Sequence, residues 1–335
     1  MRVAVALALI AAIALPLGVA NYYTQFASKV LILGILAMAL NLVVGYGGLV
    51  SMCHGAFFGL AGYVLALAAP KYEPASLWLT LPLAVVAAGA AALVIGALSL
   101  RTRGVYFIMV TLAFGEMMFY LFHDNKFSGG SDGAFINYKP EAVLFGLNLL
   151  DLEKTRIFYW TILAITVLVV LLLHMLTRAH FGRALAAARD NERRARSLGF
   201  PIYRLRLTAF VISGALAGVS GYFAAAQFGF VAPQMLGWHQ SAIALVMVVL
   251  GGMRGILGPL FGAIMVLGLE EWLKALTEHW KLVEGLIIIA IVLAFPGGLY
   301  ALIERVAPQE DHGAPAPGKA APGKEAAASG ADAHG

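Results

Sequence analysis

The sequence predicts an all-α, polytopic membrane protein, and three observations carry that prediction. The 335 residues are 61% hydrophobic and only 12% charged, with a mean hydropathy of +0.85, whereas about a quarter of a soluble domain is charged. Long uncharged runs recur, and about 20 apolar residues in a helix cross a bilayer. These runs lack the polar–apolar alternation of membrane barrel strands.

The apolar runs predict about ten membrane-spanning helices. Basic residues mark the cytoplasmic ends of such helices. If the arginine-rich loop 177–207 lies inside, both termini also lie inside and the loop 123–156 lies outside. Within the outer loop, 141–150 is too short to span and should lie at the interface or fold back. The expected spans are 3–20, 30–47, 54–69, 77–99, 105–122, 157–176, 208–227, 241–253, 257–276 and 283–303.

Residues 1–306 are therefore expected to form one transmembrane domain. Residues 1–20 resemble a signal peptide but are interpreted as an uncleaved first helix. The tail 307–335 is rich in Ala, Pro and Gly and is expected to be disordered. It matches the phosphate-loop pattern G-x-x-x-x-G-K twice, but Ala320 and Glu325 stand where Ser or Thr would bind magnesium. ATP binding by this chain is not expected.

Two glycine-rich segments interrupt the apolar pattern, at 45–59 and at 248–262. Such segments in the two halves of a transporter indicate broken helices around a central pathway. They are equally typical of tight cytoplasmic turns between two hairpin helices, so both interpretations stay open. The candidate pathway residues are Gly45, Gly47, Ser51, His54, Glu116, Gly251, Gly252 and Gly255.

Glu116 lies well inside an expected span, where a charge is costly and is a candidate functional group. It either contacts solute or ion, or it hydrogen-bonds a neighbouring helix, and the structural role is preferred. Gly214 and Gly218 form a G-x-x-x-G pair that lets helices approach closely. Histidines are scattered and Cys53 is the single cysteine, so neither a catalytic set nor a Cys-based metal site is expected.

Eight of the fourteen arginines lie between Arg178 and Arg206. The residue types from Arg183 to Gly199 favour one helix, with Gly199 as its C-cap and Pro201 as a stop signal. A rigid amphipathic helix of this kind suits docking into a groove of a partner; the alternative is a solvated basic loop. Its expected small-residue surface consists of Ala184, Ala187, Ala188, Ala195 and Leu198.

Several segments together resemble one family. GRALAAARDNERRARSLGFPIYRLRLTAF is similar to the cytoplasmic coupling loop of the branched-chain amino acid permeases of bacterial ABC importers, the LivH/LivM family, and specifically its LivM type. NLVVGYGGLVSMCHGAFFGLAGY, RGVYFIMVTLAFGEM, FSGGSDGAF and VMVVLGGMRGILGPLFGA match further blocks in the same order. The resemblance covers roughly 30–303. It departs at Gly297, where the family often has a basic residue, and in the tail.

The resemblance implies a passive permease in the bacterial inner membrane, surrounded by lipid. Its implied partners are a LivH-like second permease, two LivG/LivF-like cytoplasmic ATPases that bind ATP and Mg, and a periplasmic amino-acid-binding protein. No cofactor of its own and no nucleic acid partner are expected. The implied ATPase-coupling residues are Arg183, Ala187, Arg189, Glu192, Arg193, Arg194, Ala195, Arg196 and Gly199.

Two alternatives remain to an ABC permease that carries leucine, isoleucine and valine: another solute, or another class of transporter. Relatives within the resembling family carry urea, amides or other small organic solutes. A different class, an ion-coupled secondary transporter, would use Glu116 as its ion or proton site and need no ATPase.

Overall fold

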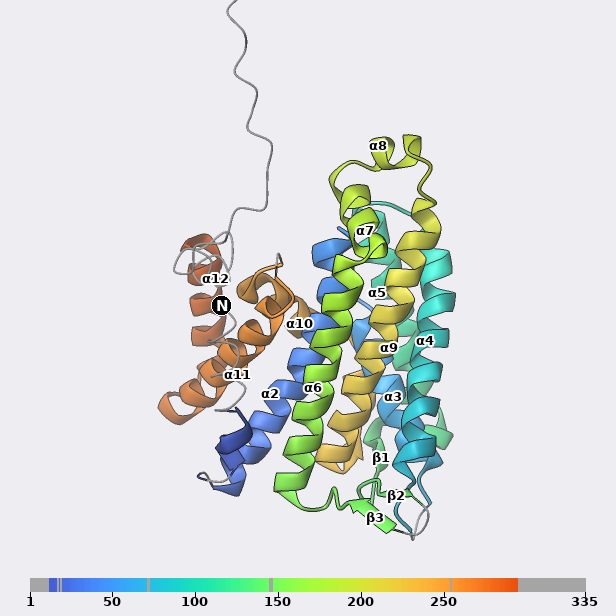
Figure 1. The fold of residues 1–335 in the computed structure, drawn as a ribbon. Helices are drawn as coiled ribbons and strands as arrows, with labels where there is room; N and C mark the ends of the chain where they lie inside the picture. The colour runs from blue at the N-terminus through green and yellow to red at the C-terminus, as the bar shows by residue number, and fades with distance from the viewer. Residues whose placement is uncertain are drawn as a thin grey trace, which may run out of the picture.

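Helices dominate the computed structural model, which describes residues 12–16, 18, 20–70, 73–144, 147–253 and 255–294. Long helices run side by side in a bundle (Figure 1). Two short helices cap one end, and short strands lie at the other. Most of the expected span 3–20, the end of the expected span 283–303, and the tail 307–335 lie outside the described residues.

The helices follow one another along the chain in the order of the apolar runs. The helical elements are α2 (Asn21–Asn41), η1 (Leu42–Tyr46), α3 (His54–Ala68), α4 (Leu77–Ser99), α5 (Val105–His123), η2 (Lys126–Ser128), η3 (Gly130–Asp132), α6 (Thr155–Arg178), α7 (His180–Asp190), α8 (Glu192–Ser197), α9 (Ile202–Phe228), η4 (Pro233–Met235), α10 (Trp238–Gly251), α11 (Gly258–Leu276) and α12 (Trp280–Ala294). The short strands, which were not predicted, lie in the connections α5–α6 and α9–α10 and are β1 (Ala134–Phe135), β2 (Ala142–Leu144), β3 (Leu147–Leu150) and β4 (Phe230–Val231).

Six helical segments in the described part of the chain are long and apolar enough to cross a membrane. They are α2 with η1, α4, α5, α6, α9, and η4 with α10. The expected number of about ten spans is therefore not confirmed. The shorter α3 has 15 residues, or about 22 Å at 1.5 Å per residue, which is less than the hydrocarbon thickness of about 30 Å.

The centre of the bundle is α9, which packs against α2, α3 and α4. The predicted close approach at the G-x-x-x-G pair is confirmed, and it lies within the chain. A Cβ added at Gly218 would lie 2.5 Å from the Cβ of Ala88, and one at Gly214 would collide with Ala92. Ala84, Ala88 and Ala92 form the facing stripe of α4 and are fully buried. Small residues on both helices thus bring the two backbones together.

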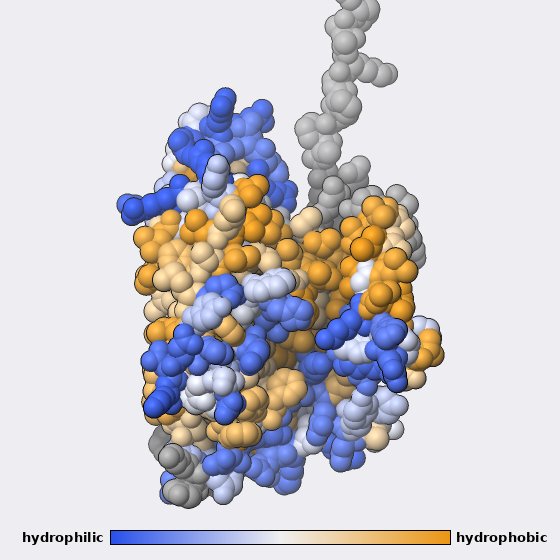
Figure 2. Space-filling model, turned by 180° about the vertical axis from the view of Figure 1, so that it is seen from behind, coloured by the Kyte–Doolittle hydropathy of each residue, from blue (hydrophilic) through white to orange (hydrophobic). Residues whose placement is uncertain are grey.

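Large apolar side chains cover the outer faces of α4, α5, α6 and α12, and these are exposed in the isolated chain. Hydrophilic residues gather at the α7–α8 end, next to a largely hydrophobic band (Figure 2). This distribution fits a bundle whose flanks lie in lipid and whose basic cap lies in water.

The strands lie in the connections at the end opposite α7 and α8. β1 pairs antiparallel with β4, which joins the segment after α5 to the segment after α9. The piece 141–150, expected to lie at the interface or fold back, folds back as the antiparallel pair of β2 and β3. The described part of the chain is therefore helical with four short strands rather than strictly all-α.

Candidate functional site

The first glycine-rich segment is a broken helix. α2 continues into the π-helical turn η1, residues 47–53 have no regular structure, and α3 begins at His54. The His54 ring bonds Ser213, near the middle of α9, at 2.8 Å from Nε2 to Oγ. Ser213 in turn donates to the carbonyl of Ala39 in α2. α3 therefore begins at mid-depth in the bundle rather than at its end.

The second glycine-rich segment is a tight turn between two helices. α10 ends at Gly251, and α11 begins at Gly258. Gly252 has φ +102°, a conformation open mainly to glycine. A Cβ at Gly251 would collide with the carbonyl of Gly258, so glycine at 251 permits the close crossing of α10 and α11. The first glycine-rich segment is thus a broken helix, and the second is a tight turn between two helices.

A further interruption precedes α10 and was not predicted. β4 lies at the strand end of the bundle, yet α10 begins only seven residues after Val231, at Trp238. The amide of Gly55, in the first turn of α3, donates to Ser241 Oγ in the first turn of α10 at 2.8 Å. The N-termini of α3 and α10 therefore meet at mid-depth. The residue types Gly229 and Pro233 are the sequence signals that could have indicated this interruption, and Gly229 indeed has φ +65°.

Glu116 lies at this meeting point. Its Oε1 accepts a hydrogen bond from the backbone N–H of Trp238 at 3.1 Å, across from α5 to the first turn of α10. A carboxylate there satisfies one of the free amides of the helix start and complements the positive end of the helix dipole. The hydrogen bond to a neighbouring helix that the preferred structural role requires is present, and the role itself stays a prediction.

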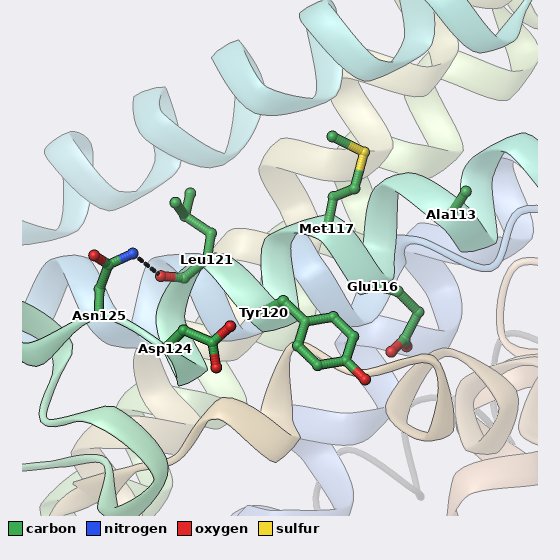
Figure 3. A pocket seen from close by; sticks show the side chains of 7 residues that line it. All are labelled: Ala113, Glu116, Met117, Tyr120, Leu121, Asp124 and Asn125. Carbon is green, nitrogen blue, oxygen red and sulfur yellow. Dashed lines mark hydrogen bonds between the residues drawn. The ribbon is translucent and has the colours of Figure 1, made fainter.

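Glu116 also borders an open groove of about 650 Å³ on the surface of α5. In Figure 3 the side chains of Glu116 and Tyr120 point to the same side of the helix, and Met117 points to the other. The groove is lined by Ala113, Glu116, Met117, Tyr120, Leu121, Asp124 and Asn125. The remaining candidate pathway residues are buried inside the chain: Gly45, Gly47, Ser51, His54, Gly251, Gly252 and Gly255.

The two glycine-rich segments touch each other near the α7–α8 end. A Cβ at Gly45 would lie 2.5 Å from the carbonyl oxygen of Met253. Asn41, which the sequence analysis missed, donates from Nδ2 to the carbonyl of Gly255 at 3.1 Å. A buried polar side chain near the end of a span was the available signal for Asn41.

The arginine-rich stretch forms two helices, which corrects the expectation of one helix from Arg183 to Gly199. Asn191 separates α7 from α8, with φ −153°. Its side-chain oxygen accepts from the amide of Arg194 at 3.0 Å. Asparagine is among the strongest N-cap residues, so it ends α7 and starts α8 despite the good helix formers on both sides.

Gly199 ends α8 as predicted. It has φ +84°, and its N–H donates to the carbonyl of Arg196 at 3.0 Å. The N–H of Phe200 donates to the carbonyl of Ala195 at 3.3 Å. This pair of bonds is a Schellman cap, in which glycine adopts the left-handed conformation.

The expected small-residue docking surface is largely turned inward. Ala195 packs with Ala188 and Ile202 and is only 2% exposed, and Ala184 is also buried. Alanine fits a buried or an exposed position equally well, so its pattern alone could not decide the orientation. The exposed residues on this unit include Arg183, Ala187, Arg193 and Arg194.

Glu192 joins three separate parts of this end of the bundle. Its carboxylate pairs with Arg103 before α5 at 3.0 Å, with Arg196 on α8 at 2.9 Å, and with Arg206 on α9 at 3.1 Å. The side chains of Glu192 and Arg206 are 23% and 16% exposed. Arg196 is thus engaged within the chain rather than free for a partner.

No group of three or more His, Cys, Asp or Glu side chains suited to a metal ion occurs among the described residues. The chemistry available at the site is therefore that of helix ends, one carboxylate, glycine-rich backbone and a basic cap.

Comparison with known proteins decides the family. A family model described as "Branched-chain amino acid transport system / permease component" matches residues 22–292, which include both glycine-rich segments, Glu116 and the α7–α8 unit. The chain belongs to this permease family. It is accordingly a multi-pass membrane permease component of an ABC transporter and not an enzyme, and permeases of this family work with ATPase and binding-protein partners.

Relatives of the permease include the high-affinity branched-chain amino acid permease LivM of Escherichia coli K12. The identity is 33% over 312 residues, which are 87% of this chain and 73% of the relative. LivM of Salmonella typhimurium gives the same values. The autoinducer 2 permease LsrC of Escherichia coli O9:H4 is 33% identical over 147 residues, 42% of this chain and 43% of the relative. No solved structure gives a significant match.

Proposed function

We propose that this permease imports leucine, isoleucine and valine across a bacterial inner membrane. The observation that carries the proposal is its similarity to LivM permeases over 87% of the chain. The LsrC-type relatives, which are named for another solute, match less than half of it. The sequence blocks that contain the two glycine-rich segments, Glu116 and the α7–α8 unit resemble those of LivM-type permeases and follow the same order.

The proposed assembly contains a LivH-like second permease, two LivG/LivF-like ATPases and a periplasmic amino-acid-binding protein. In it, the α7–α8 end faces the cytoplasm together with both termini, as the positive-inside rule favours. The exposed guanidinium groups of Arg183, Arg193 and Arg194 would contact acidic surface on an ATPase. ATP and Mg would be bound by the ATPases alone.

Within this assembly, the groove beside Glu116 is the proposed edge of the solute pathway. It is open in the isolated chain, its Glu116 contacts the N-terminus of α10, and such helix starts favour the carboxylate of an amino acid. Glu116 itself would hold the start of α10 in place. The bond from its carboxylate to a backbone amide argues for this role over that of a transported-ion site.

The test is uptake of radiolabelled leucine into proteoliposomes that contain the purified complex and the loaded binding protein. We expect uptake that requires ATP, persists without an ion gradient, and is inhibited by isoleucine and valine but not by urea or acetamide. Inhibition by urea or amides alone would reassign the solute within the family. Uptake that follows an ion gradient without ATP would contradict the ABC mechanism.

A further inference from the structure

The side chain of Arg189, on α7, reaches from the basic cap into the first helix break. Its Nη1–H donates to the carbonyl of Gly45 in the π-helical turn η1. Its aliphatic stem covers Gly48, where φ is +68° and an added Cβ would lie 2.6 Å from Arg189 Cγ. Only glycine at position 48 leaves room for both the backbone conformation and the arginine stem.

The contact has the chemistry of a helix C-cap supplied by another helix. The last carbonyls of a helix have no partner within it, and the negative end of the helix dipole favours a cation there. Gly45 contributes one such carbonyl where α2 and η1 end. Asp190 holds the guanidinium in place, because its Oδ1 accepts from Arg189 Nε at 3.0 Å and from Nη2 at 2.9 Å.

The capped turn is also the place where the two glycine-rich segments meet. Gly45 packs against the carbonyl of Met253, and Asn41 bonds the carbonyl of Gly255. A displacement of Arg189 therefore acts on the ends of α2 and α10 at once. It does so through closely packed backbone, which has little room to absorb movement.

From the capped turn, the chain leads directly to the middle of the bundle. Residues 47–53 connect η1 to α3, and the amide of Met52 donates to Thr111 Oγ1 on α5 at 3.2 Å. The amide of Gly55 donates to Ser241 on α10 at 2.8 Å. Glu116 is on α5 and accepts a hydrogen bond from the start of α10, so a continuous series of contacts joins α7 to Glu116.

We propose that Arg189 is the positioning residue through which movement of the α7–α8 unit is passed to the break between α2 and α3, and from there to the helix ends beside Glu116. The inference rests on the proposed ATP-driven transport function. It assigns Arg189 an inward role, distinct from the outward docking role of Arg193 and Arg194.

The test compares Arg189→Ala with Arg204→Ala in proteoliposomes. Arg204 is an exposed arginine at the start of α9 and serves as the matched control. Solute uptake per ATP hydrolysed is measured for complexes that retain the ATPases. We expect Arg189→Ala to keep ATPase binding but to lower this ratio on the order of ten-fold, as fits loss of a charged hydrogen bond. Arg204→Ala should keep the wild-type ratio.

A double-mutant cycle with Gly48→Ala separates the contact from general damage. Gly48→Ala should lower the ratio by displacing the arginine stem, and adding Arg189→Ala should lower it little further, because both changes break the same contact. If Arg189→Ala does not assemble, the same cycle is run with Arg189→Lys, which keeps the charge and loses the planar fork.

The inference is overturned if wild-type uptake is ATP-driven and Arg189→Ala retains the wild-type ratio, or if the effects of the two substitutions simply add. Failure of the proposed function is seen separately, as wild-type uptake that does not depend on ATP. That result would overturn the inference as well, because no ATPase movement would remain to transmit.

Discussion

Replacing Glu192 by glutamine removes one negative charge from among three guanidinium groups while keeping the shape of the side chain. The pairs with Arg103 and Arg196 involve partners that are 70% and 64% exposed, so each is worth about 0.2–1 kcal/mol. Arg206 is only 16% exposed, and loss of its carboxylate costs about 1.5–3 kcal/mol. The sum is on the order of 2–5 kcal/mol.

We expect this loss to appear as local opening of the α7–α8 unit, because Glu192 fastens it to α9 and to the loop before α5. At about 1.4 kcal/mol per ten-fold, amide hydrogen exchange in 180–199 should accelerate by roughly 30-fold to 4,000-fold. Hydrogen-exchange mass spectrometry of the permease in detergent micelles measures this directly. Peptides from α4 and α6 should exchange at their wild-type rates.

The matched control is Asp151→Asn, which breaks an exposed pair with Lys154 (3.2 Å) in the loop before α6. This substitution should change exchange around its own site only, and by less than about 1 kcal/mol. If Glu192→Gln leaves exchange in 180–199 within three-fold of wild type, the carboxylate does not fasten the unit, and the argument from its three ion pairs is wrong.

Three further predictions address packing, the helix start at mid-depth and orientation. Gly218→Ala should lower the free energy of unfolding by about 1–3 kcal/mol through overpacking. The control Gly268→Ala, with no atom within 4 Å of its new Cβ, should be neutral or stabilising. Equal effects of the two substitutions in SDS unfolding would refute the packing argument. Glu116→Gln should preserve assembly and uptake, because an amide oxygen can still accept the hydrogen bond at the start of α10, and Glu116→Ala should impair both. A Glu116→Gln permease that assembles but does not transport would show that the charge itself is needed. After the native cysteine is replaced, a cysteine introduced at Ser131 should react with an impermeant thiol reagent in intact spheroplasts, and one introduced at Ser197 should not. The reverse labelling pattern would invert the proposed topology.

The order and the approximate limits of the helices could be predicted from the sequence, because a bilayer imposes length and apolarity on each span. The expected span 77–99 coincides with α4, and 105–122 with α5. The C-cap at Gly199 was also predictable, since Gly followed by Pro201 is a local signal. Features that depend on one short stretch of residues were thus accessible.

Features that depend on contacts between distant residues were not accessible. Glu192 bonds Arg103 and Arg206, and Arg189 bonds Gly45, but nothing in either local sequence specifies the partner. The inward orientation of Ala195 depends on the turn at Asn191, which the helix propensity of its neighbours concealed. The expected span 241–253 starts close to α10, but the mid-depth position of this start was missed, because depth depends on contacts with distant residues such as Gly55.

The proposed transport mechanism depends most on α7 and α8 being the place where an ATPase engages this permease. Arg193→Glu combined with Arg194→Glu reverses two exposed charges on α8 and leaves the buried Ala195 and the Glu192 pairs in place. Like charges that face each other at such an interface cost on the order of 2–5 kcal/mol of binding free energy. Co-purification from membranes should therefore recover the second permease but not the ATPases, whereas Arg204→Glu should recover both. Recovery of the ATPases with the double variant, together with intact solute-stimulated ATP hydrolysis, would mean that the arginine run only sets topology and that the coupling assignment is wrong.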